Sequence, residues 1–323
     1  MTRYRTGDKD PGRGGEATAA GPDAGPAPAV PGGPGTRAAV TDTDTAAAPR
    51  PDAVTCTGLV HAFGDTTAVD GLELSVRDGE VFGLLGPNGA GKTTAIRCIT
   101  TLLPVQAGTV RVFGHDAARE RMAVRRLLGY VPQQLSADSG LTGRENVELF
   151  ARVFDVSRRE RAARVGQALA AVDLVDAADR LAKTYSGGMV RRLELAQALV
   201  SAPRLLILDE PTIGLDPIAR TSVWEHINAV RAATGMTVLV TTHYMDEADQ
   251  YCDRVALMHR GRVRALGTPD ELRTGLAERR GAESGAQPTL EDVFRDIAGS
   301  GLDDQSGDFS DVRSTRRTAS RVG

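Results

Sequence analysis

Eight consecutive residues have the types and the spacing of a phosphate-binding loop. They are Gly86, Pro87, Asn88, Gly89, Ala90, Gly91, Lys92 and Thr93, with Thr94 directly after them, and they match the pattern GxxxxGK[ST]. In that pattern the glycines let backbone N–H groups point at one anion, the lysine reaches the β- and γ-phosphates, and the threonine hydroxyl binds Mg²⁺. An apolar run at 81–85 precedes the loop, and a helix-like segment at 94–99 follows it. Because this chemistry needs a strand, a glycine loop and a helix in that order, an accidental glycine-rich turn is the weaker interpretation.

Further candidate groups follow two other apolar runs. Asp209 and Glu210 come directly after 205–208, and His243 comes shortly after 236–240. A carboxylate at Asp209 can hold the shell of a Mg²⁺ ion, and Glu210, as the next residue, points elsewhere. The alternatives are an exposed pair of carboxylates in a turn and a histidine with a purely structural role.

The elements that must position these groups alternate between strands and helices. The apolar runs are typical of strands buried on both faces, and helical patterns cover 186–200 and 217–232. This alternation predicts an α/β fold with a mainly parallel sheet. Ligands of such sheets lie beyond the carboxyl ends of the strands, which is where the glycine loop, Asp209-Glu210 and His243 all fall.

Two further sequence patterns indicate two subdomains in addition to the α/β core. Alternating segments at 54–60 and 72–76 indicate an antiparallel β subdomain. Residues 141–183 have helical spacing and no strand signal, which indicates a helical subdomain inserted into the α/β unit.

Composition limits the class of protein. A chain of 323 residues with 41% hydrophobic and 25% charged residues is ordinary for a globular protein with a sizeable core. The net charge of −3 gives no electrostatic argument for binding nucleic acid. Cys56, Cys98 and Cys252 are far apart, which argues against a disulfide framework or a zinc site. No apolar run approaches the roughly 18 residues that span a bilayer, so a role at a membrane would need a partner chain.

The composition also divides the chain. Residues 1–52 are rich in Gly, Pro, Ala and Thr, so we expect a disordered N-terminal tail. Residues 53–280 should form one nucleotide-binding domain, with the helical subdomain at about 134–190. Residues 281–323 should be a short, largely disordered extension with one or two amphipathic helical turns at 290–297.

From about Val54 to Gly267 the chain resembles the nucleotide-binding subunit of an ATP-binding cassette (ABC) transporter, with the motifs in the order and spacing of that family. The resemblance implies that ATP and Mg²⁺ bind, with Thr93, Asp209 and Gln133 near the metal. It also implies that Glu210 is the general base and that His243 contacts the γ-phosphate. Gln133 follows Tyr130-Val131-Pro132, and the family pattern makes it a stronger candidate than Gln134.

A second anion site is indicated where Ser186, Gly187 and Gly188 open a helix. One chain does not need two γ-phosphate sites. The resemblance implies two cassettes arranged head to tail, so that this motif covers the ATP held by the other copy. The family usually has Leu-Ser-Gly-Gly-Gln here, whereas this chain has Tyr185 before the motif and Met189 after it.

Four other positions have more than one interpretation. Asp216 resembles the family's residue that crosses the dimer interface, but it also suits the cap of the helix that begins at Pro217. Phe63 could stack on adenine or pack in the core. Arg191 and Arg192 are expected on a solvated or interface face.

The resemblance is strongest to ATPases of the daunorubicin-resistance type, on the segments 185–189, 241–249 and 290–294. It implies a bacterial multidrug or antibiotic exporter on the cytoplasmic face of the membrane, paired with a second cassette, as a homodimer, and with a separate permease. The alternatives are export of another cargo, such as a lipid or polysaccharide, a soluble ABC ATPase in translation or DNA repair, and a regulator that does not hydrolyse ATP. A single glycine loop, the short helical insertion and the presence of both Glu210 and His243 argue against the last two.

Overall fold

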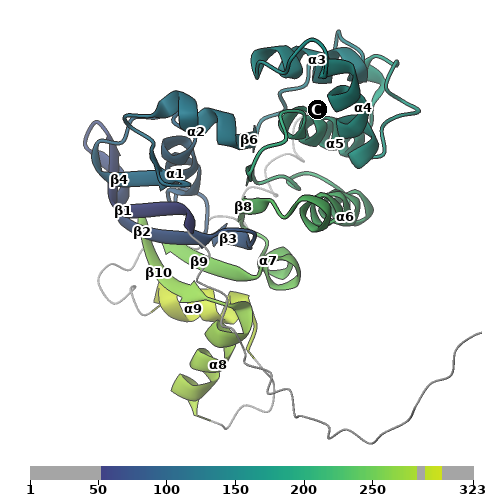
Figure 1. The fold of residues 1–323 in the computed structure, drawn as a ribbon. Helices are drawn as coiled ribbons and strands as arrows, with labels where there is room; N and C mark the ends of the chain where they lie inside the picture. Colours follow the sequence, from purple (N-terminus) through teal and green to yellow (C-terminus); the bar gives the residue numbers. More distant parts are fainter. Residues whose placement is uncertain (1–51, 282–287, 300–323) are drawn as a thin grey trace, which may run out of the picture. The chain divides into compact units, whose positions relative to one another are not determined.

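The computed structural model describes residues 52–281 and 288–299, and its largest element is a six-stranded sheet (Figure 1). In spatial order its strands are β10 (Arg262–Gly267), β9 (Arg254–His259), β3 (Val81–Leu85), β8 (Thr237–Thr242), β7 (Leu205–Asp209) and β6 (Leu128–Val131). All neighbouring strands are parallel except the β9–β10 hairpin. The prediction of a mainly parallel α/β sheet is confirmed.

Both faces of this sheet are covered. Every residue of β3, β7 and β8 is buried. Along β3, Val81 and Leu85 pack into one hydrophobic cluster, and Phe82 and Leu84 pack into another. Successive side chains of a strand point to opposite faces of the sheet. When both faces are covered by apolar clusters, the sequence of the strand is therefore an unbroken apolar run.

The structure also has a four-stranded antiparallel sheet, whose strands come from both sides of the glycine loop in the chain. Its order is β2 (Thr66–Arg77), β1 (Asp52–Phe63), β4 (Ala107–Val112) and β5 (His115–Asp116). Its buried side chains share a cluster with Ile96 of α1 (Lys92–Ile99). The chain remains extended as far as Phe63, and a turn at Gly64 and Asp65 leads into β2.

Three helices form the inserted helical part. They are α3 (Gly143–Val153), α4 (Arg161–Ala171) and α5 (Gly187–Leu199), and they contact one another (Figure 1). A 3₁₀ turn at Ala182–Thr184 comes just before α5. Thr142 and Glu145 form a reciprocal capping box at the start of α3, which satisfies two backbone N–H groups that would otherwise lack partners.

The remaining helices pack on the sheet and its connections. The long helix α6 (Pro217–Thr234) ends at Gly235, whose φ of 70° suits a residue without a side chain. Three helices were not anticipated from the sequence: α2 (Arg121–Leu127), α7 (Met245–Tyr251) and α8 (Pro269–Arg280). The fully buried indole of Trp224 stacks on Tyr251 with ring centroids 4.6 Å apart, which ties α6 to α7.

The C-terminal segment contributes to the core. Helix α9 (Leu290–Gly299) has ten residues, about three turns, where the sequence suggested one or two. Leu290 and Val293 are buried in the same cluster as the helical part and one face of the central sheet. The expected tail at 1–52 lies outside the described residues, apart from Asp52 at the start of β1, and so do residues 282–287 and 300–323.

The burial of α9 predicts a stability effect. Leu290→Ala should lower the free energy of unfolding by about 2 to 5 kcal/mol, because it removes buried methyl groups and leaves a cavity. Urea denaturation followed by circular dichroism measures this. Met122→Ala, at an exposed side chain of α2, is the control and should change the value by less than about 0.5 kcal/mol. Equal midpoints for both variants would contradict the prediction.

Candidate active site

The glycine loop joins β3 to α1, as the sequence predicted. Gly86 and Gly91 have φ values of 154° and 102°. A Cβ at Gly86 would come within 2.2 Å of the Met258 carbonyl oxygen, and one at Gly91 within 2.2 Å of the Ala68 carbonyl oxygen. The loop therefore needs glycine at both positions, for backbone conformation and for close approach of other backbone.

Lys92 is buried at the mouth of this loop, with 4% of its surface exposed. Its Nζ donates to the carbonyl oxygens of Gly86 at 2.7 Å and Pro87 at 3.2 Å. It also lies 3.4 Å from Oε1 of Glu210. The ammonium group thus sits between the glycine loop and the carboxylate that follows β7.

The last residue of β7, Asp209, has one satisfied and one unsatisfied carboxylate oxygen. Its Oδ1 accepts from the hydroxyls of Thr241 at 2.6 Å and Thr93 at 3.2 Å. Its Oδ2 is buried and has no hydrogen-bond partner. Burial raises the pKa of Asp209, and the Thr241 and Thr93 hydrogen bonds oppose that rise. A carboxylate oxygen without a partner beside a threonine hydroxyl is a donor set that fits a hard divalent cation.

The next residue, Glu210, faces a different environment. Its backbone has a φ of 51°, and its N–H donates to both the carbonyl and the hydroxyl oxygen of Thr241 at 3.0 Å. Its Oε2 lies 3.4 Å from Nε2 of Gln133 and 3.3 Å from Nδ1 of His243, the latter without hydrogen-bond geometry. Asp209 and Glu210 are only 1% and 5% exposed, so the alternative of an exposed carboxylate pair is wrong.

The convergence follows from strand order. Gly86, Gln133, Glu210 and His243 come just after the carboxyl ends of β3, β6, β7 and β8, and these four strands are neighbours in the sheet. Residues from four distant segments therefore meet around one carboxylate. A cavity of about 590 Å³ opens beside them, lined by Gly86, Pro87, His243 and residues of α7 and α9.

The other predicted binding residues lie apart from this cluster. Ser186 is the exposed N-cap of α5, and its Oγ accepts from the Met189 N–H at 3.3 Å. Asp216 caps α6 by accepting from the Ala219 N–H at 2.9 Å, which confirms the capping interpretation. The two helix starts are neighbours, since a Cβ on Gly188 would lie 3.1 Å from that of Ala219. Among the described residues, no hydrogen bond or ion pair joins Ser186 or Asp216 to Lys92 or Glu210.

Phe63 and Tyr185 have environments that the sequence left open. Phe63 is 52% exposed at the end of β1 and meets the His61 ring edge to face, so packing in the core is wrong. Tyr185 donates its phenol O–H to the Ala177 carbonyl at 2.7 Å. Its oxygen would lie 2.2 Å from a Cβ at Gly143, so this tyrosine fixes the approach of α3 to the Ser186 motif.

Sequence reasoning missed three supporting residues. Thr241 holds both Asp209 and Glu210 through one hydroxyl, as described above. Glu247 of α7 is buried, accepts from the Thr212 hydroxyl at 2.7 Å and lies 3.3 Å from Nε of Arg220. Burial raises its pKa. No local signal singles out Thr241 or Glu247, because their partners come from other elements.

Arg191 is the third, and the expectation of a solvated or interface face is wrong for it. It is 4% exposed and pairs with Glu194 at 2.8 Å. The i, i+3 spacing of opposite charges was the signal available in the sequence. Arg192 is partly exposed and donates to the carbonyl oxygens of Val172 and Asp173.

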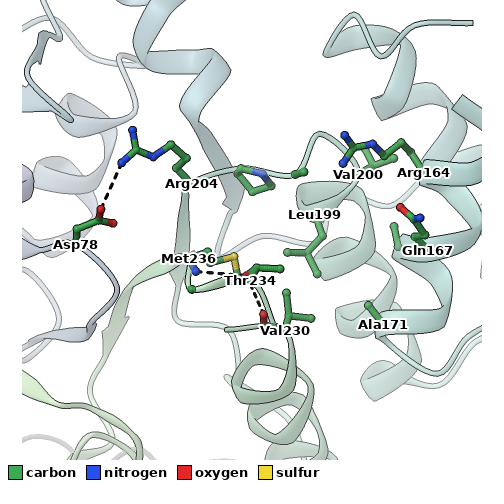
Figure 2. A pocket seen from close by; sticks show the side chains of 14 residues that line it. Asp78, Arg164, Gln167, Ala171, Leu199, Val200, Arg204, Val230, Thr234 and Met236 are labelled. Carbon is green, nitrogen blue, oxygen red and sulfur yellow. Dashed lines mark hydrogen bonds and ion pairs between the residues drawn. The ribbon is translucent and has the colours of Figure 1, made fainter. Parts of the chain in front are cut away.

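A second cavity, of about 580 Å³, lies elsewhere (Figure 2). Its lining includes Arg204 and Met236, which precede β7 and β8. It therefore opens at the opposite ends of these strands from Glu210. In it Arg204 pairs with Asp78 at 3.3 Å.

Comparison with known proteins decides the family. The model of the ABC transporter family matches residues 69–213. The daunorubicin/doxorubicin resistance ATP-binding protein DrrA of Streptomyces peucetius is 50% identical over 224 residues, covering 69% of this chain and 68% of the relative. The chain belongs to the ABC transporter family. It is an ATP-binding subunit of that family, related to ATPases of exporters, and it hydrolyses ATP.

Other ABC proteins agree with this assignment. The Nod factor export ATP-binding protein I of Paraburkholderia xenovorans (strain LB400) is 44% identical over 211 residues, covering 65% of this chain and 69% of the relative. A dimeric ATP-binding cassette with bound ADP and phosphate matches with a TM-score of 0.60 and 27% identity. It covers 67% of this chain and 98% of that one. ABC transporter subunits of this kind dimerise and work with membrane permeases. None of the helices in the described residues combines the length and apolar character needed to cross a bilayer.

The shared hydroxyl of Thr241 gives a test of the active site. Thr241→Val keeps the shape of the side chain but removes the two hydrogen bonds of the hydroxyl, one to Asp209 and one from the Glu210 N–H. We expect kcat for ATP hydrolysis to fall about 10- to 100-fold, since hydrogen bonds to charged groups contribute about 1.5 to 3 kcal/mol. A colorimetric phosphate assay measures the rate.

Two further variants provide the controls. Thr241→Ser should retain most of the activity. Thr237→Val removes an equally buried hydroxyl at the other end of β8, which donates to Asp78 and accepts from the Gly79 N–H. It should leave kcat within about threefold of the parent, because Asp78 and Gly79 lie outside the cluster around Glu210. Parental kcat in Thr241→Val would show that the hydroxyl does not position the carboxylates.

Proposed function

We propose that this chain powers the export of a hydrophobic drug or antibiotic through a separate membrane permease, as a pair of cassettes on the cytoplasmic face of the membrane. The observation that carries the proposal is the set of groups around Glu210, namely Lys92 at 3.4 Å, His243 at 3.3 Å and Gln133 at 3.4 Å. Phosphoryl transfer to water depends on positioning and charge stabilisation, and these groups supply both.

In this proposal each group has a defined task. Glu210 accepts the proton of the attacking water as general base. His243 contacts the γ-phosphate, and Lys92 moves from the loop carbonyls to the β- and γ-phosphates. Gln133 orients the water beside Oε2 of Glu210. Phe63, with about half of its surface exposed, stacks on the adenine.

Asp209, Thr93 and Gln133 are proposed to hold Mg²⁺. The unpartnered Oδ2 of Asp209 and the neighbouring Thr93 hydroxyl suit a cation that takes its other ligands from phosphate and water. When bound, the ion would neutralise charge that develops on the phosphate oxygens. No cluster of three or more His, Cys, Asp or Glu side chains suited to a metal occurs in the described part of the chain.

A second copy is proposed to complete each ATP site, and a homodimer is the simplest arrangement. Ser186 and Gly187 are exposed at the start of α5, beside the start of α6 and its cap Asp216. Helix starts of this kind favour anions but carry no general base. Facing the Lys92 loop of another copy, they would close the triphosphate from the other side.

The permease is proposed to dock beside the segment that follows Gln133. Leu135 in that segment and Leu149 and Val153 on α3 are large apolar side chains with much of their surface exposed. Apolar side chains exposed on adjoining elements are typical of a surface that a partner covers. The relationship to a daunorubicin/doxorubicin resistance protein favours a drug as cargo, and a lipid or polysaccharide is the alternative.

The assignment of the general base predicts the behaviour of one variant. Glu210→Gln keeps the size and one acceptor oxygen, but its amide cannot take up a proton at neutral pH. Steady-state ATP hydrolysis should fall by a factor of at least about 10³ while ATP still binds, since binding depends on the loop and Lys92. The variant should also accumulate as a dimer with ATP, seen by light scattering. Hydrolysis at the parental rate would refute this assignment.

Export itself is tested in the source bacterium. Deleting the coding sequence should raise the accumulation of daunorubicin or of other hydrophobic antibiotics, measured by fluorescence or mass spectrometry. Complementation with the parental chain should reverse the effect, and complementation with Glu210→Gln should not. Unchanged accumulation across the panel would reject drug export and favour a lipid or polysaccharide cargo.

A further inference from the structure

The segment after β6 is fastened to helix α5 by a buried pair of charges. Arg191 of α5 donates from Nη1 to the Pro132 carbonyl at 3.0 Å and from Nη2 to the Gln133 carbonyl at 2.6 Å. The same Nη1 lies 2.8 Å from Oε2 of Glu194, one turn further along α5. The other oxygen of Glu194 accepts from the N–H and the hydroxyl of Ser136. The guanidinium thus binds the backbone at Pro132 and Gln133, and the carboxylate binds it three residues later at Ser136.

A second set of hydrogen bonds extends this attachment. Asn146 of α3 accepts from the Asp138 N–H and donates to its carbonyl oxygen, both at 2.9 Å. Gln197 of α5 donates to Oδ1 of Asn146 at 3.1 Å. Side chains of α3 and α5 therefore bind the stretch 132–138 at four of its residues, Pro132, Gln133, Ser136 and Asp138. Arg191 and Glu194 are the charged members, and with 4% and 2% exposure they are almost completely removed from water.

Burial makes this attachment difficult to release. If the segment moved away from α5, the Arg191 guanidinium would lose two acceptors, and Glu194 would lose two donors. The two charges would still pair with each other, but buried polar groups that lose hydrogen bonds are destabilising, so the segment and the helix favour moving together. At the far end of α5, Leu199 and Val200 line the cavity of about 580 Å³ shared with α4 and α6 (Figure 2).

The two ends of this rigid unit have different neighbours. At one end, the side chain of Gln133 lies 3.4 Å from Glu210 in the ATP site of the same chain. At the other, Ser186 caps α5 five residues before Arg191, on exposed surface. A displacement of Gln133 is therefore passed to the Ser186 end of the helix without a flexible joint between them.

We propose that Arg191 and Glu194 are positioning residues that couple the two ATP sites of a pair of cassettes. They fix the position of Ser186, which acts on the ATP of the second copy, to that of Gln133 at the chain's own ATP. The inference rests on the proposed function, because only in a pair does Ser186 meet a nucleotide. In the described residues the side chains of Arg191 and Glu194 bind one another and the segment 132–136 rather than Lys92, Glu210 or His243, so their loss should change coupling and turnover rather than nucleotide affinity.

The experiment compares three variants of the full chain with the parent. Arg191→Met removes the charge and the donors at similar length, and Arg191→Lys keeps the charge but cannot reach both carbonyls with a planar fork. The double variant Arg191→Met/Glu194→Met leaves no unpaired charge and guards against simple unfolding. Initial rates across ATP concentrations give kcat and the Hill coefficient, and a fluorescent ATP analogue gives the dissociation constant.

For Arg191→Met and the double variant we expect kcat to fall about tenfold and the Hill coefficient to approach about 1, with nucleotide affinity within about twofold of the parent. Arg191→Lys should recover part of the lost kcat and part of the lost cooperativity. The matched control is Arg254→Met, which breaks the largely buried pair with Glu80 at 3.0 Å, far from Glu210 in sequence and at the opposite end of β3. It should lose thermal stability but retain the parental Hill coefficient.

The outcomes separate the two levels of inference. If the parent itself does not pair or shows no cooperativity, the proposed pair of cassettes fails. If the parent is cooperative and the folded double variant keeps the parental kcat and Hill coefficient, the coupling role is overturned. Loss of cooperativity in Arg254→Met as well would show a general effect of lost stability, and would also overturn it.

Discussion

The burial of the Glu210 carboxylate is the constraint that organises this protein. A carboxylate removed from water is costly unless charged and polar partners surround it. Here the partners are Lys92, Gln133 and His243, and each follows the carboxyl end of a different strand. They can meet only because β3, β8, β7 and β6 are consecutive in a parallel sheet. The order of the strands, and the two hydrophobic clusters that fix it, are therefore conditions of the chemistry as well as of stability.

Backbone conformation separates the two neighbouring carboxylates. Asp209 continues the strand, whereas Glu210 leaves it with a φ of 51°, a conformation that is unfavourable for a residue with a side chain. The two hydrogen bonds from its N–H to Thr241 offset that cost. As a result one carboxylate presents an oxygen beside Thr93 and the other faces a lysine, a histidine and an amide. Distinct environments are what allow adjacent acids to take different roles.

What the sequence predicted depends on how local the information is. The glycine loop, the buried strands and the helix caps could be predicted, because each follows from a few consecutive residues. The capping box of Thr268 and Glu271 was equally local, and α8 was overlooked although that signal was present. Arg191 offered only its i, i+3 spacing with Glu194 as a local signal, because the Gln133 carbonyl that it binds lies 58 residues away. Thr241 offered none, since Asp209 lies 32 residues away. Helix α7, which has three acidic residues, is held by the burial of Glu247 and by the stack of Tyr251 on Trp224.

The proposed pair has two surfaces that would meet each triphosphate, one around Glu210 and one at the start of α5. Their different chemistry explains why the proposed ATP site needs both. The surface around Glu210 has the Lys92 ammonium group, the proposed base and the proposed metal ligands. The start of α5 has only neutral donors. The Ser186 hydroxyl accepts from the Met189 N–H, yet its own proton remains free to donate, because a hydroxyl accepts and donates at once. The first N–H groups of a helix likewise lack partners within the helix. Such donors add no competing charge to the triphosphate, so they complement a site that already holds Lys92. If Arg191 and Glu194 fix those donors to Gln133, closing one site changes the donors that the other receives.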